Sequence, residues 1–120
     1  MKRTTITIKV AHKGQRHGEY KEHEIAAYMD DRAPHLAIHR PIAKTTGELL
    51  AADNWTVSHV KTGYRVLYGP VPTRREAIAY AIEFQKHGDF SLDDPRAVYD
   101  SFTIPLGQAV SLAIAAAAIA

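Results

Sequence analysis

The sequence predicts one α+β domain: an antiparallel sheet of four to five strands, a capped amphipathic helix on one face and an Ala-rich C-terminal helix. Three observations indicate this class. Apolar and polar residues alternate in several short segments, a turn signal divides two of them, and a helix cap follows. A chain of 120 residues that is 46% hydrophobic builds one core. We expect a domain over residues 1–105 and a helix over residues 106–120.

The first element expected is a strand over residues 4–10, TTITIKV. Ile6, Ile8 and Val10 share one face with Thr4, and polar side chains occupy the other. This alternation predicts a strand with one buried side. The polar segment that follows, HKGQRHG, contains two glycines and predicts a turn.

Residues 19–29, EYKEHEIAAYM, fit two structures. Good helix formers dominate, and a helix would cluster Ile25, Tyr28 and Met29, yet the segment also alternates as a strand does. We favour a strand, because residues 30–34, DDRAP, predict a turn and residues 35–40, HLAIHR, alternate again. The helix stays open as an alternative.

Residues 55–68 predict a β-hairpin, after a long connection over residues 41–54 that includes one helical turn near residues 48–52. Gly63 ends the turn sequence KTG, which suits a three-residue loop with its glycine in the left-handed region. This loop gives the following pairs: Val60 with Tyr64, His59 with Arg65, Ser58 with Val66, and Val57 with Leu67.

Both faces of this hairpin are apolar in the expected register. One face carries Val60, Tyr64, Val66 and Tyr68, and the other carries Trp55, Val57 and Leu67. A sheet that is apolar on both sides needs two covers. The next helix supplies one, and we expect the C-terminal helix or a partner to supply the other.

That next helix begins after Thr73, whose spacing to Glu76 is that of a capping box. We expect it to end near Gly88. Its apolar side is predicted to hold Ala77, Ile78, Ala81, Ile82 and Phe84. Further along, Asp94-Pro95 predicts the start of a short helix.

Residues 106–120, LGQAVSLAIAAAAIA, carry no charged side chain. As a helix they would span ~22 Å, less than the ~30 Å core of a bilayer. We therefore expect no membrane role, and a helix that packs on its own domain or forms a homodimer interface.

Composition and motifs exclude several classes of function. The absence of cysteine removes disulfides and thiol chemistry, and a formal charge of +2 does not by itself indicate nucleic acid. No GxSxG, HExxH, Walker A or GxGxxG pattern occurs, so we expect neither an enzyme nor a cofactor. The basic start continues into alternation and not into an apolar run, so we expect no signal peptide and a cytoplasmic protein.

The seven histidines do not have the spacing of a metal site, and we expect no metal. His35 and His39 would lie ~13 Å apart on a strand. His59 is the strongest single candidate for catalysis, because a sheet holds it rigidly beside Ser58. A cross-strand polar contact opposite Arg65 is the simpler interpretation, and a small enzyme around His59 ranks third among the functions considered.

Charge is distributed in patches, which suits a charged partner. The acidic residues expected to contact a protein partner are Glu19, Glu22, Glu24, Asp30, Asp31, Asp89, Asp93 and Asp94. The basic residues that would contact nucleic acid in the alternative function are Lys61, Arg65, Arg74 and Arg75, beside Tyr64 and Tyr68.

The run from His35 to Ala77, with LAIHRP, WTVSH, the TG turn and the TxxEA helix start, resembles small proteins carried by phages and plasmids. Some of these are anti-CRISPR proteins. The resemblance implies a non-enzymatic inhibitor that blocks a nuclease or surveillance complex of bacterial defence. The alternative is a small nucleic-acid-binding accessory or regulatory protein that uses the basic hairpin.

Overall fold

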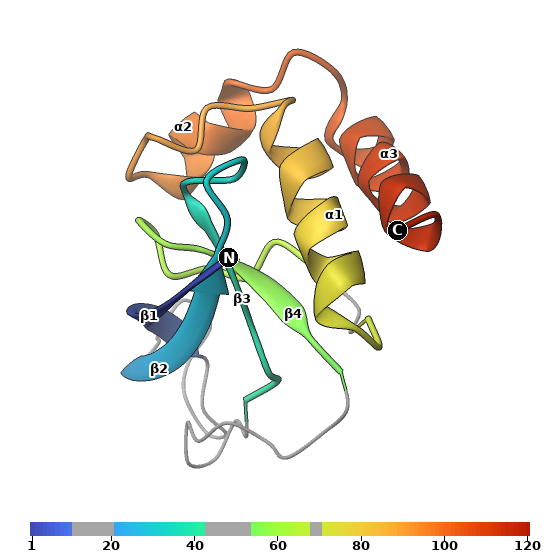
Figure 1. The fold of residues 1–120 in the computed structure, drawn as a ribbon. Helices are drawn as coiled ribbons and strands as arrows, with labels where there is room; N and C mark the ends of the chain where they lie inside the picture. The colour runs from blue at the N-terminus through green and yellow to red at the C-terminus, as the bar shows by residue number, and fades with distance from the viewer. Residues whose placement is uncertain (11–20, 43–53, 68–70) are drawn as a thin grey trace.

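The computed structural model describes residues 1–10, 21–42, 54–67 and 71–120. In these residues four strands precede three helices, and Figure 1 shows their arrangement. The sheet is antiparallel with the order β1-β2-β3-β4, which confirms the predicted α+β class. The strands are β1 (Lys2–Val10), β2 (Lys21–Met29), β3 (Leu36–His39) and β4 (Thr56–His59). The helices are α1 (Arg74–Gln85), α2 (Pro95–Asp100) and α3 (Leu106–Ala118).

The first two strands form a long ribbon in which Ile6 lies opposite Ile25. The strand interpretation of residues 21–29 is thus confirmed, and the helix alternative is wrong. Ile6, Ile8 and Ile25 are buried, whereas Thr5 and the other polar residues that alternate with them on β1 are exposed. The predicted half-buried character of β1 is confirmed.

Strands β3 and β4 are short and buried on both faces. Ile38 pairs with Val57 on the side of the helices, and Ala37 pairs with Ser58 on the opposite side. Both faces are covered, as a sheet with two apolar sides requires.

The hairpin after β4 has a register that differs by one residue from the predicted one. Ser58 pairs with Arg65, and the backbone N–H of His59 donates to the oxygen of Tyr64 at 2.8 Å. The loop therefore holds residues 60–63, and Gly63 takes the expected left-handed backbone with φ of 75°. The longer loop reaches β1, where Lys9 N–H donates to the oxygen of Gly63 at 2.8 Å.

This last bond links β1 to the loop that follows β4, and so brings together the two ends of the strand order. The curled sheet encloses a small core of its own. Its buried members are Ile6, Ile8, Ile25, Ala27 and Ala37, with Met29, Ile42 and Val60 packed against them.

A larger core lies between the sheet and the helices. Helix α1 begins after the predicted cap: the Thr73 hydroxyl oxygen accepts the Glu76 N–H at 3.1 Å. Tyr80, absent from the predicted apolar side of this helix, is buried and donates its hydroxyl to the oxygen of Val66 at 2.9 Å. Asp94 caps α2, as predicted, through the Ala97 N–H at 3.1 Å.

Helix α3 does not cover the second face of the sheet, which corrects one of the two placements expected. Figure 1 shows it beside α1, on the same side of the sheet. Its alanines at four-residue spacing, Ala109, Ala113 and Ala117, are buried in the larger core, because small side chains let two helices approach closely. The second face is covered by the curl of β1 and β2. A homodimer through α3 stays a prediction.

Within the described residues, no helix combines the length and the apolar character that crossing a membrane requires.

Candidate functional site

Four side chains from separate elements meet at one edge of the sheet, and we call them the guanidinium–aromatic cluster: Tyr28, Arg40, Trp55 and Arg74. The guanidinium carbon of Arg40 lies 4.6 Å from the centre of the Trp55 ring. That of Arg74 lies 4.7 Å from the Tyr28 ring and 5.5 Å from the Trp55 ring. The two rings meet edge to face with centres 5.9 Å apart.

Strand pairing brings three of these residues together. His39 pairs with Thr56, so Arg40 and Trp55 occupy the next positions where β3 ends and β4 begins. Tyr28 pairs with Ile38 and lies on the same side of the sheet as the helices. Antiparallel pairing thus gathers residues that are far apart in the sequence.

The start of α1 supplies the fourth residue. Trp55 and Val71 exchange backbone hydrogen bonds of 2.7 and 3.0 Å, which fix the chain just before the helix. The Thr73 cap then makes Arg74 the first residue of α1. The position of Arg74 over both rings therefore follows from the helix start.

A guanidinium stacked on an aromatic ring is held in position while its N–H groups point outward around its rim. In the described part of the chain, Arg74 and Arg75 form no ion pair with a carboxylate. Both side chains are exposed, whereas Trp55 and Tyr28 are half-buried. The arrangement offers oriented donors for an anion beside partly accessible aromatic surface.

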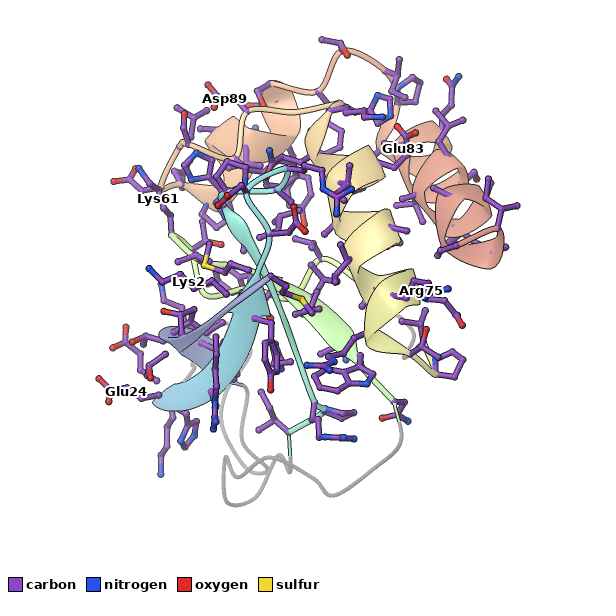
Figure 2. All side chains as sticks on the ribbon, viewed as in Figure 1. Lys2, Glu24, Lys61, Arg75, Glu83 and Asp89 are labelled. Carbon is purple, nitrogen blue, oxygen red and sulfur yellow. The ribbon has the colours of Figure 1, made fainter. Side chains whose placement is uncertain are left out.

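The four basic residues predicted for nucleic acid do not form one patch. Lys61 lies in the hairpin loop and Arg75 at the start of α1, and Figure 2 shows them on opposite sides of the molecule. Arg65 pairs with Ser58 in the middle of the hairpin. Only Arg74 joins the cluster. Tyr64, predicted beside the arginines, instead lies under Lys9, whose ammonium is 5.3 Å from the ring centre.

Three of the predicted acidic residues hold local structure. Asp30 accepts two bonds of 2.9 Å from the Arg32 guanidinium, which hold the pKa of Asp30 well below its usual range. Asp89 accepts the Ser91 N–H at 3.0 Å, and hydrogen bonds from Ser91 lower the Asp89 pKa. The third is Asp94, the cap of α2.

The other acidic residues differ in placement. Glu22 and Glu24 are exposed on the same side of β2, and Figure 2 shows Glu24 projecting away from the body of the protein. Asp31 and Asp93 are exposed in turns. Glu19 lies outside the described residues.

His39 and Ser58 form a buried hydrogen-bonded pair, with His39 Nε2 2.8 Å from Ser58 Oγ. His39 Nδ1 lies 2.7 Å from the backbone oxygen of Arg40, so Nδ1 carries the proton and Nε2 accepts from the serine. Burial lowers the pKa of His39 and keeps the ring neutral. Both residues are only 2% exposed, which keeps substrate-sized molecules away from the hydroxyl.

His59, the predicted candidate for catalysis, is also 2% exposed. Its Nε2 donates to the backbone oxygen of Phe90 at 2.6 Å, and its Nδ1 accepts from the Thr62 hydroxyl at 2.8 Å. The expected cross-strand contact with Arg65 is wrong, because the register shift places Tyr64 opposite His59. His59 instead ties the hairpin loop to the segment between α1 and α2.

No three histidine or carboxylate side chains in the described ranges converge as metal ligands would. Comparisons of this chain with models of protein families, with curated proteins and with solved structures found no match. The guanidinium–aromatic cluster is therefore the candidate site from which function is inferred.

Proposed function

We propose that this protein acts by binding and not by catalysis, and that it engages single-stranded nucleic acid through the guanidinium–aromatic cluster. The stacking of Arg74 on Tyr28 and Trp55 carries this proposal. It combines two contacts that single strands use: N–H donors for phosphate, and guanidinium planes, backed by aromatic rings, on which a base can stack.

Single strands fit better than duplexes for two reasons. Their bases are free to stack on rings and on guanidinium planes, which contributes about 1–3 kcal/mol per base, whereas duplex bases already stack on one another. The formal charge of only +2 also supplies little general attraction to the densely spaced phosphates of a duplex. Affinity must then come from the few oriented arginines.

Binding of a fluorescein-labelled oligo(dT) strand, followed by anisotropy, tests this function. Arg74→Ala should weaken binding at least about tenfold, because a lost charge-assisted contact is worth roughly 1.5–3 kcal/mol and each 1.4 kcal/mol is about a factor of ten. Arg96→Ala is the matched control, since Arg96 is an exposed arginine on α2. Equal binding by the natural protein, Arg74→Ala and Arg96→Ala would refute the assignment of the site.

A second candidate is the inhibitor of bacterial defence, which would use acidic residues against the basic grooves of a nuclease or surveillance complex. The exposed pair Glu22 and Glu24 on one side of β2 favours it. The double variant E22K/E24K should then lose inhibition of CRISPR effector complexes, whereas Asp100→Lys, an exposed change on α2, should keep it. Unchanged inhibition by the double variant would show that Glu22 and Glu24 do not contact the partner. Either partner would place the protein in the cytoplasm.

A further inference from the structure

A groove of about 420 Å³, which we call the α1 groove, lies beside the guanidinium–aromatic cluster. It runs along α1 between the turn after β2 and the end of α3. Figure 2 shows Arg75 on the first turn of α1. Its lining residues are Met1, Arg32, Arg74, Arg75, Ile78, Ala79, Ile82 and Ala120.

One wall of the groove is a single stripe of α1. Arg75, Ile78, Ala79 and Ile82 follow the spacing of one helix face, and the stripe is ~10 Å long. The two isoleucines are half-buried and pack only in part against the larger core. The stripe is therefore aliphatic along its length and cationic at its N-terminal end.

The cationic end has uncompensated charge. Arg32, on the opposite rim, is neutralised by its bond to Asp30, with Nε 2.9 Å from the carboxylate. In the described ranges no carboxylate pairs with Arg74 or Arg75. An anion at this end would gain contacts that the protein itself does not supply.

We infer that the α1 groove binds a medium-chain fatty carboxylate. Its head would lie against Arg75, whose guanidinium can hold one carboxylate with two parallel bonds, and its chain would cover Ile78 and Ile82. The groove volume falls in the roughly 300–1,000 Å³ range of small-molecule sites, and its length is too short for a docked helix of several turns. This site shares Arg74 with the guanidinium–aromatic cluster, but its ligand and its head-group residue Arg75 do not depend on the proposed function.

Octanoate is the probe, with the isoleucine methyl groups of the full chain followed by NMR. Saturable shifts are expected at Ile78 and Ile82, while Ile114, which is exposed on α3 and does not line the groove, reports non-specific contact with apolar surface. Octanol lacks the charge and acetate lacks the chain. Each should bind at least about tenfold more weakly than octanoate.

Variants distinguish the contact with the carboxylate head group from non-specific hydrophobic binding. Arg75→Gln should weaken octanoate about tenfold and Arg75→Lys should restore part of the affinity, whereas Arg96→Gln should have no effect. Equal affinity in Arg75→Gln would overturn the inference, as would equal shifts at Ile114. If oligo(dT) displaces octanoate and shifts Ile78 itself, the groove belongs to the nucleic-acid site and the lipid assignment is wrong.

Discussion

The guanidinium carbon of Arg40, directly after β3, lies 4.6 Å from the centre of the ring of Trp55, directly before β4. The pairing of His39 with Thr56 makes these two residues neighbours, so the sheet register itself builds half of the cluster. Arg74 completes it from the start of α1. The cluster thus depends at once on strand pairing and on a helix cap.

Gly63 should be sensitive to substitution, because its backbone is left-handed and the space around it is tight. Gly63→Ala would place an alanine in the left-handed backbone conformation, which is strained for a residue with a side chain. Its methyl group would also lie 3.1 Å from Lys9 N and 3.2 Å from Thr7 O. We expect a loss of about 1–3 kcal/mol in the free energy of unfolding, measured by urea titration. Gly107→Ala is the control, because nothing lies within 4 Å of its added atom and alanine favours a helix by roughly 0.5–1 kcal/mol. Unchanged stability in Gly63→Ala would contradict the closure of the sheet onto β1.

His59→Ala should be more damaging than the loss of one hydrogen bond. It removes both bonds of the ring and its edge-to-face contact with Phe90, whose centre lies 5.4 Å away. A cost of about 2–4 kcal/mol is expected from the unpaired backbone oxygen and the space left behind. Thr62→Val removes the partner of Nδ1 and the acceptor of the Tyr64 N–H at 3.3 Å, and it should cost about 1–2 kcal/mol. The reverse order of the two losses would show that His59 is not a structural tie.

Stability should fall as the solution becomes mildly acidic. Burial lowers the pKa of both His39 and His59 from the usual value of 6.5. In mildly acidic solution the unfolded chain therefore binds more protons at these two histidines than the folded chain does. Their contribution is fully present above about pH 6.5 and is lost as the pH falls below it. The slope is at most about 1.4 kcal/mol per pH unit for each histidine. Urea unfolding at pH 7.5, 6.5 and 5.5 gives the free energy of unfolding as a function of pH. This dependence should be shallower for His59→Gln than for the natural protein, and an equal dependence would count against a neutral buried His59 ring.

Local signals predicted several elements correctly. The alternation of Ile6 and Ile8 located β1, the spacing of Thr73 and Glu76 located the start of α1, and Asp94-Pro95 located α2. In each case the deciding interactions lie within a few residues of the sequence. Such signals do not depend on where the rest of the chain goes.

Long-range contacts decided what the sequence could not show. The observed hairpin register is accompanied by a bond from the Lys9 N–H to the Gly63 oxygen, and α3 lies on α1, where its buried alanine stripe permits close packing. Arg40 was missed for the same reason, although its place directly after β3 and that of Trp55 directly before β4 would indicate their contact once the two strands are paired. Lys61 and Arg65 looked close to Arg74 in sequence, but the hairpin carries its loop away from the helix start.

Trp55 is the only tryptophan of the chain, so its emission reports directly on the cluster. The central claim is that a single strand binds at this ring. Titration with unlabelled oligo(dT) at low salt should quench the Trp55 emission in a saturable way, and added salt should weaken the quenching. Arg40→Ala and Arg74→Ala should reduce the quenching, whereas Arg96→Ala should keep it. Unchanged Trp55 emission under conditions where the labelled strand binds, or no binding of the strand at low salt, would contradict it.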